Sequence, residues 1–324
     1  MSAPAAEPST DTTDWTASGL ERGRGGDGGS ARVPGQVHSL SPSRASDFKT
    51  CPLLYRLRSI DRLPERPSPD AVRGTVVHAV LERLYDLPAA ERTLGAAVSL
   101  VGPQWQRLLE LEPTLAELFG ADPADPADPD HPDRADESAW LDSARALVEG
   151  YFTLEDPQRL EPAERECLVE TELDDGLRLR GYVDRLDVTP TGDIRVVDYK
   201  TGGAPREAFE AKALFQMKFY ALVLWRSRGV IPRMLRLIYL KDRDTLTYTP
   251  DEDELRRFER TLQAIWVAIT RAMLTEDFRP SPGALCAWCD HQALCPAFGG
   301  TPPPYPHPEQ DAEAPATAPP TTPV

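Results

Sequence analysis

The chain contains 324 residues, of which 40% are hydrophobic, and it carries a net charge of −16 at pH 7. This length allows one large domain or two of ordinary size, with enough apolar side chains for a sizeable core. No apolar run approaches the ~20 residues that span a membrane, and the first residues lack the features of a signal peptide. We therefore expect a cytoplasmic protein with no membrane contact.

The negative charge is concentrated in one part of the chain. Residues 117–175 contain 19 acidic side chains and four arginines, which accounts for nearly the whole deficit. By contrast, residues 178–243 carry 14 basic and seven acidic side chains, and residues 31–66 carry seven and three. Because Lys and Arg bind phosphate groups, this asymmetry permits a polyanionic substrate despite the acidic total. A charged run is more often a solvated face, so the asymmetry does not prove such a substrate.

The two ends of the chain differ in composition from the middle. Residues 1–36 are rich in Gly, Ser, Ala and Asp, and residues 299–324 are dominated by Pro and Thr. Such segments bury too little apolar surface to fold, so we predict two disordered tails around one ordered domain at 37–298. Within it, an acidic repeat with Pro at every third position, at about 118–135, is predicted to be a spacer or surface insertion.

Hydrophobic periodicity predicts the elements between the tails. Helices are expected at 45–58, capped by Ser43 or Ser46, and at 72–87, 94–119, 138–154, 205–228 and 251–274. Strands are expected at 166–173 and from 177 onward. The second leads into a hairpin whose two strands are 181–188 and 193–199, and further strands are expected at 234–240 and 245–249. This order predicts an α/β or α+β domain with a central mixed sheet flanked by helices.

The predicted hairpin at 181–203 carries the first candidate site. Asp184 lies on its first strand, and Asp198 and Lys200 lie on its second. Since Asp198 and Lys200 are two residues apart, their side chains project from the same face. Two carboxylates suit Mg2+ or Mn2+, and a neighbouring lysine can stabilise charge on a phosphate. A solvated surface hairpin can show the same D-x-K pattern, so the hairpin alone leaves both interpretations open.

Two predicted helices each place a pair of polar residues on one face. His78 and Glu82 are four residues apart, as are Gln216 and Tyr220. A lone histidine on a helix is more often packed or solvated than a metal ligand, so the significance of His78 depends on which other ligands reach it. Cys167 lies among apolar residues of a predicted strand, and we interpret it as a core thiol.

The other four cysteines form a pattern. Cys286, Cys289 and Cys295 have the spacing C-x2-C-x5-C, which suits Zn2+ or an iron-sulfur cluster. The fourth ligand is either Cys51, which also precedes a proline, or the nearby His291, which would complete a Cys3His zinc site. With Cys51, the metal would join the two ends of the ordered domain, and its loss would destabilise the whole fold. Scattered core cysteines are the remaining alternative.

Several of these stretches, in order along residues 41–298, resemble motifs of the RecB-like branch of the PD-(D/E)XK nuclease superfamily, which includes AddB-type and CRISPR-associated iron-sulfur exonucleases. GTVVHAVLE at 74–82 resembles G-T-x-x-H, GYVDRLD at 181–187 resembles G-x-x-D-R-x-D, VDYKTG at 197–202 resembles D-Y-K-T-G, and QMKFYA at 216–221 resembles Q-x-x-x-Y. The cysteine pattern is also similar. The resemblance implies a restriction-endonuclease-like α/β core whose ends are joined by an iron-sulfur cluster.

The resemblance also implies roles for particular residues. The implied metal ligands are His78, Asp184, Asp198 and the backbone carbonyl of Tyr199, with Lys200 as the catalytic lysine. Gln216 and Tyr220 would line the active site and help to hold the DNA strand. A [4Fe-4S] cluster would bind Cys51, Cys286, Cys289 and Cys295, with Zn2+ as the less favoured occupant. The catalytic cofactor would be Mg2+ or Mn2+, and because histidine is a softer ligand than Mg2+ prefers, Mn2+ is expected to serve at least as well.

We therefore expect a metal-dependent DNA exonuclease of the RecB family that acts on single strands or ends in repair or recombination. Because the chain contains no G-x-x-x-x-G-K-[ST] motif, we expect it to be free-standing or the nuclease subunit of an assembly with a helicase or repair partner. One alternative is a non-catalytic iron-sulfur DNA-binding subunit of a helicase-nuclease or CRISPR-type complex, although the intact acidic and basic residues of the site argue against it. Another is a zinc-containing protein of unrelated function.

Overall fold

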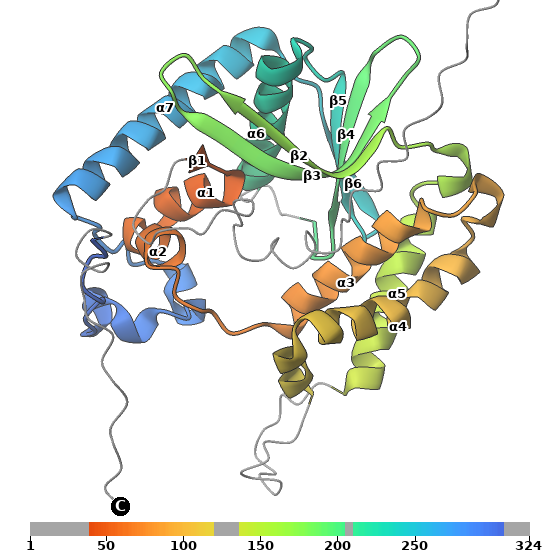
Figure 1. Ribbon diagram of the computed structural model, residues 1–324, viewed down its shortest axis with the longest axis horizontal. Helices are drawn as coiled ribbons and strands as arrows, with labels where there is room; N and C mark the ends of the chain where they lie inside the picture. The colour runs from red at the N-terminus through yellow and green to blue at the C-terminus, as the bar shows by residue number, and fades with distance from the viewer. Residues whose placement is uncertain (1–38, 120–135, 205–209, 308–324) are drawn as a thin grey trace, which may run out of the picture.

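The structure of the chain is a computed structural model that describes residues 39–119, 136–204 and 210–307 (Figure 1). The predicted N-terminal tail, residues 120–135 of the predicted acidic insertion and residues 308–324 of the predicted C-terminal tail lie outside these ranges. Within the ranges, no helix combines the length and the apolar character needed to cross a membrane.

A mixed sheet forms the centre of the domain. Among the described residues its strands are β1 (Ser39–Leu40), β2 (Glu164–Glu172), β3 (Arg178–Val188), β4 (Ile194–Lys200), β5 (Met234–Tyr239) and β6 (Asp244–Tyr248). Along the sheet the order is β1, β3, β4, β5 and β6, and β2 also pairs with β3. β3 runs antiparallel to β2 and β4, whereas β4 runs parallel to β5. A parallel pair needs a crossover, and α6 (Glu210–Arg228) lies in the connection between β4 and β5.

Helices cover both faces of the sheet (Figure 1). One face carries α3 (Pro69–Leu84), α4 (Leu94–Leu111) and α5 (Glu137–Phe152), and the other carries α1 (Pro42–Thr50), α2 (Pro52–Tyr55), α6 and α7 (Glu252–Thr275). Neighbouring residues of a strand therefore enter different cores: Val196 packs with α6 and α7, and Val197 packs with α3 to α5. Burial on both faces explains why β4 and β5 contain runs of neighbouring apolar residues, such as Val196–Val197 and Leu237–Ile238. The predicted α/β arrangement of a mixed sheet flanked by helices is confirmed.

The first predicted helix is divided in two. α1 is capped by Ser41, rather than by either of the two serines expected in that role, and Pro42 occupies its first position. α1 ends before Pro52, because a proline inside a helix clashes with the preceding turn; here it begins α2 instead. Cys51 lies at the junction with an extended backbone. Its thiol is therefore placed between two short helices near the start of the domain.

The ordered domain extends further toward the C-terminus than the composition predicts. The Tyr305 ring stacks on Phe278 with 6.0 Å between centroids, and the Arg56 guanidinium donates to the Pro303 carbonyl oxygen. Residues 299–307 therefore pack against the domain, where the composition predicts the beginning of a tail. Composition does not reveal such packing, because an extended Pro-rich segment makes no internal hydrogen bonds and can still lie along a surface.

Two helical glycines allow a matched test of the packing between α5 and the sheet. A Cβ on Gly150 would lie 2.4 Å from the Leu240 carbonyl oxygen, whereas one on Gly95 of α4 would lie 4.0 Å from the Thr93 hydroxyl oxygen, an ordinary contact. We expect Gly150→Ala to lower the free energy of unfolding by about 1–3 kcal/mol through overpacking. We expect Gly95→Ala to raise it by about 0.5–1 kcal/mol, because alanine restricts the unfolded chain. Urea denaturation measures both changes, and equal stability of the two variants would contradict the described packing.

Candidate active site

His78, Glu166 and Asp184 converge from three elements. Nδ1 of His78, on α3, lies 3.4 Å from Asp184 Oδ2 on β3 and 3.9 Å from Glu166 Oε1 on β2. One ligand atom of each residue lies within 4.8 Å of the other two. An imidazole and two carboxylates form a donor set that suits divalent cations such as Mn2+. This group is therefore a candidate metal site.

The sheet opens at this site. Pairing between β3 and β4 ends at Arg185 and Val197. Just beyond this pair, the N–H group of Tyr199 donates a hydrogen bond of 2.7 Å to Asp184 Oδ2. The Asp184 carboxylate therefore occupies the opening between the two strands, and a charge-assisted bond to the backbone fixes its orientation.

Glu166 faces Asp184 across the β2–β3 pair. The residue pairs on either side of them are in regular antiparallel register, but Glu166 itself has φ +46°, in the left-handed region. A non-glycine residue in this region is strained by about 1–2 kcal/mol. In addition, two carboxylates directly opposite each other on neighbouring strands repel. A cation bound between the two carboxylates would remove this repulsion.

Asp198 and Lys200 lie beside this group at the end of β4. Lys200 Nζ is 2.5 Å from Asp198 Oδ2, and the Gln216 side chain on α6 donates to Asp198 Oδ1 at 2.9 Å. The same amide group of Gln216 lies 3.3 Å from the Tyr220 hydroxyl. Neighbouring side chains therefore hold both carboxylate oxygens of Asp198.

The structure brings the predicted residues into two adjoining groups and adds one residue to them. The predicted ligands His78 and Asp184 are joined by Glu166, which the sequence analysis missed. Asp198 contacts Lys200 and Gln216 instead, so its role as a metal ligand stays a prediction. The same holds for the carbonyl of Tyr199, since the structure shows this residue contacting the site through its N–H group.

The charges of the site depend on one another. Burial lowers the pKa of His78, but Asp184 and Glu166 stabilise the imidazolium and raise this pKa to about 9. Burial opposes ionisation of Asp184, yet the positive charges of His78 and Lys200 outweigh it and lower the pKa of this carboxyl. Burial raises the pKa of Asp198, an effect that Lys200 opposes and Asp184 reinforces. Without a cation, a proton on His78 thus balances part of the negative charge.

Three of the four patterned cysteines share one region of the structure. Ser281 donates its N–H group to the Cys51 sulfur at 3.4 Å, although the two residues are 230 positions apart. Gly283 donates to the Cys286 sulfur at 3.3 Å. Burial, with smaller contributions from Cys51 and Cys286, raises the pKa of the Cys289 thiol. The fold therefore brings the N-terminal cysteine near Cys286 and Cys289.

The structure does not show the arrangement expected for a single zinc ion. Within the described ranges, no three cysteine sulfurs lie within 4.8 Å of one another, as ligands of one ion would. The competing ligand His291 is buried, and its Nε2 lies 3.1 Å from Glu65 Oε1. Cys167 packs against the α6 and α7 core, and burial raises the pKa of its thiol to about 12. It is therefore protonated at neutral pH, as expected for a core thiol.

Comparison with known families decides the classification of the chain. The profile of the PD-(D/E)XK nuclease superfamily matches residues 39–296, from β1 to the cysteine segment. The chain belongs to this superfamily. Within a PD-(D/E)XK nuclease, the group of His78, Glu166 and Asp184 is the candidate site for the divalent metal, and Lys200 lies next to it.

Individual proteins resemble this PD-(D/E)XK nuclease over most of their length. The gene 69 protein of Mycobacterium phage D29 is 26% identical over 274 residues, covering 80% of this chain and 96% of that protein. The gene 69 protein of Mycobacterium phage L5 is 24% identical over 292 residues, with the same coverage of 80% and 96%. The crystal structure of an exonuclease candidate from Eubacterium rectale has a TM-score of 0.50 and 12% identity, covering 89% of this chain and 94% of that one. At this identity the structural similarity shows the fold alone.

Metal binding by this PD-(D/E)XK nuclease is expected to depend on pH. A cation at the site must displace the proton that His78 retains up to a pKa of about 9. Between about pH 6 and pH 8, the affinity for Mn2+ should therefore rise about tenfold for each pH unit. Calorimetric titration without nucleic acid measures both the affinity and the proton release. His78→Gln should flatten the pH dependence, and an unchanged slope in this variant would contradict the role of His78.

Proposed function

We propose that this chain is a metal-dependent deoxyribonuclease that hydrolyses phosphodiester bonds as an exonuclease, on single strands or DNA ends. The convergence of His78, Glu166 and Asp184 beside the Asp198–Lys200 pair carries the proposal. Membership of the nuclease superfamily supports the reaction type. The exonuclease mode is proposed from the sequence motifs at 74–82, 181–187, 197–202 and 216–221.

The proposed cofactor is Mg2+ or Mn2+, held by His78, Glu166 and Asp184. The facing carboxylates of Glu166 and Asp184 fit a cation, because a positive charge between the two side chains removes their repulsion. When bound, the cation neutralises charge on the attacked phosphate and lowers the pKa of water. Since an imidazole is among the ligands, Mn2+ is expected to bind at least as well as Mg2+.

Lys200 is the proposed catalytic lysine. Burial lowers its pKa, but Asp198 and Asp184 outweigh burial and raise it above the ordinary value, so the side chain is an ammonium at neutral pH. An ammonium near the scissile phosphate stabilises the negative charge that develops during hydrolysis. Gln216 and Tyr220 would hold Asp198, and through it Lys200, in position, with contact to the DNA strand as a second proposed role.

DNA repair or recombination in the cytoplasm is the proposed setting, within the RecB-like branch of the superfamily. Residues 178–243, which include β3, β4, α6 and β5 and supply Asp184, Asp198 and Lys200, carry 14 basic and seven acidic side chains, so this part of the chain attracts a polyanion. A helicase or a repair complex is the proposed partner, because the sequence contains no phosphate-binding loop of its own.

We also propose that a [4Fe-4S] cluster binds Cys51, Cys286, Cys289 and Cys295. Each thiolate of such a cluster binds a different iron atom, so the sulfur atoms need not lie as close together as the ligands of one zinc ion. Backbone N–H donors at Cys51 and Cys286 fit this role, because such bonds stabilise cluster thiolates. When bound, the cluster would link the two ends of the domain.

Cleavage of end-labelled single- and double-stranded DNA with Mg2+ or Mn2+ tests the proposed activity. Asp184→Asn, Glu166→Gln and Lys200→Ala are each expected to slow cleavage by at least about 100-fold, because metal binding or charge stabilisation is lost. Glu170→Gln is the matched control, since Glu170 lies exposed on the same strand as Glu166. The product ladder gives the polarity. Wild-type protein that binds Mn2+ but cuts no substrate would contradict the nuclease proposal and favour a DNA-binding subunit.

Visible absorption of anaerobically purified protein tests the proposed cluster. The wild type should absorb broadly in the visible, because iron bound by thiolates is coloured, whereas Zn2+ is not. Cys289→Ser should remove this absorption, and Cys167→Ser should leave it unchanged, since Cys167 packs in the core. A colourless protein with one equivalent of zinc would contradict the cluster and favour the zinc alternative.

A further inference from the structure

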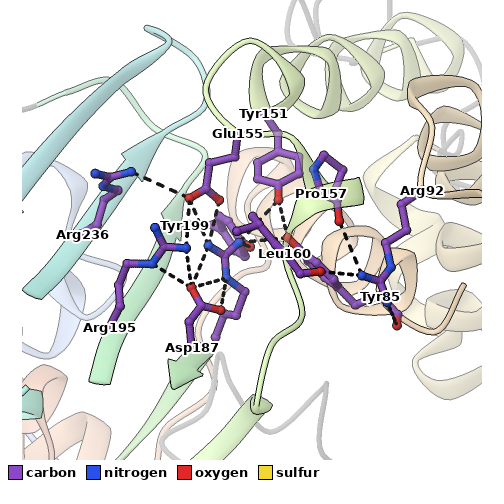
Figure 2. A network of polar contacts seen from close by, with 11 residues as sticks. Tyr85, Arg92, Tyr151, Glu155, Pro157, Leu160, Asp187, Arg195, Tyr199 and Arg236 are labelled. Carbon is purple, nitrogen blue, oxygen red and sulfur yellow. Dashed lines mark hydrogen bonds and ion pairs between the residues drawn. The ribbon is translucent and has the colours of Figure 1, made fainter. Parts of the chain in front are cut away.

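Arg185 follows Asp184 in the chain and lies in a buried polar network, with its partners Glu155, Asp187 and Tyr199 shown in Figure 2. Only 1% of the Arg185 surface is exposed. Its guanidinium lies 2.8 Å from Glu155 Oε2 and 3.1 Å from Asp187 Oδ1. The two carboxylates compensate the buried charge of Arg185, although they also contact the more exposed Arg195 and Arg236.

Three tyrosine hydroxyls surround the same guanidinium. Nη1 of Arg185 lies 2.6 Å from the hydroxyl of Tyr199, 3.1 Å from that of Tyr85 and 3.4 Å from that of Tyr151. Tyr199 belongs to β4, Tyr85 follows α3, and Tyr151 belongs to α5. Arg185 thus links a central strand to two helices, and its shortest contact is with Tyr199.

Tyr199 also contacts two of the candidate metal ligands. Its ring meets the imidazole of His78 edge to face, with 6.1 Å between the ring centroids and an angle of 87° between the ring planes. Its N–H group donates to Asp184 at 2.7 Å. One residue therefore touches His78 through its ring, Asp184 through its backbone and Arg185 through its hydroxyl. A shift of Tyr199 would move the surroundings of both ligands at once.

Stability alone is a weak explanation for this network. Replacing a buried ion pair by apolar groups of similar volume is often neutral or stabilising, so a hydrophobic core could hold these elements together equally well. An arginine differs from apolar groups in its planar fork of donors, which fixes its partners in direction as well as in distance. The distinctive contribution of Arg185 is therefore the orientation of the groups that it contacts.

We infer that Arg185 is a positioning residue for the metal site: it holds the hydroxyl of Tyr199, and Tyr199 holds the imidazole of His78 and the carboxylate of Asp184. This inference rests on the proposed function, because it assumes that these two side chains bind a cation. It gives Tyr199 a side-chain role that is separate from the predicted role of its carbonyl oxygen. Affinity for the metal should thus depend on a hydroxyl group that does not touch the metal.

Tyr199→Phe, with Tyr151→Phe as its matched control, tests the inference. Each variant loses one buried hydroxyl next to Arg185, but Tyr151 contacts the ring of Tyr199 rather than the ligands. The readouts are Mn2+ affinity of the folded protein without DNA and the midpoint of thermal unfolding. We expect Tyr199→Phe to weaken Mn2+ binding about tenfold or more, as for other residues that orient metal ligands. Tyr151→Phe should change the affinity less than about twofold at a similar loss of stability.

Arg185→Lys provides a second test of the inference, because lysine keeps the positive charge but lacks the planar fork of donors. If Arg185 acts through Tyr199, the effects of Arg185→Lys and Tyr199→Phe on Mn2+ affinity should not add in the double variant. Wild-type affinity in Tyr199→Phe, or equal weakening in Tyr151→Phe, would overturn the inference alone. Wild-type protein that binds no Mn2+ would overturn the proposed metal site, and this inference with it.

Discussion

The hydrogen bond from the Tyr199 N–H group to the Asp184 carboxylate is the constraint on which the site depends. Antiparallel strands normally satisfy their N–H groups with backbone carbonyls, but β3 and β4 stop pairing one step before this position. A side-chain oxygen takes the place of the carbonyl. The sheet can therefore open without leaving a buried donor unsatisfied, and the opening brings a carboxylate to the point where α3 and β2 supply His78 and Glu166.

Opening the sheet places several acidic groups where water screens them poorly. Glu166, Asp184 and Asp198 are nearly buried, and the described positive charges nearest to them are His78, when protonated, and Lys200. Of the acidic residues at 117–175, which hold most of the negative charge of the chain, Glu166 belongs to this group. The balance of positive and negative charge is set locally at the site. The proton on His78 supplies one of the positive charges, and a divalent cation would replace it. The raised pKa of His78 and the proposed metal site are thus two consequences of the same arrangement.

Local patterns in the sequence predicted the sheet, the helices and the D-x-K pair, because spacing of two or four residues fixes which side chains share a face. Glu166 was missed, but it could have been found: Glu166 and Asp184 are equally far from Asp175 in the turn, so the hairpin register places them opposite each other. The surroundings of Arg185 could not be found this way. Tyr85 at the end of α3 and Tyr151 on α5 reach it through packing between the helices and the sheet, which no local spacing determines. The packing of residues 299–307 was missed for the same reason.

The contacts between the two ends of the domain change what a cluster on the cysteines would do. Arg56 already binds Pro303, and Glu65 already binds His291, so protein groups alone connect the N-terminal helices to the C-terminal segment. These contacts belong to the core beneath α1, α2, α6 and α7, whereas α3 to α5 form a separate core on the other face of the sheet. A cluster bound there would therefore reinforce one edge of one core. Its loss should loosen that edge, while α3, which carries His78, stays packed against the sheet through contacts that no cysteine makes.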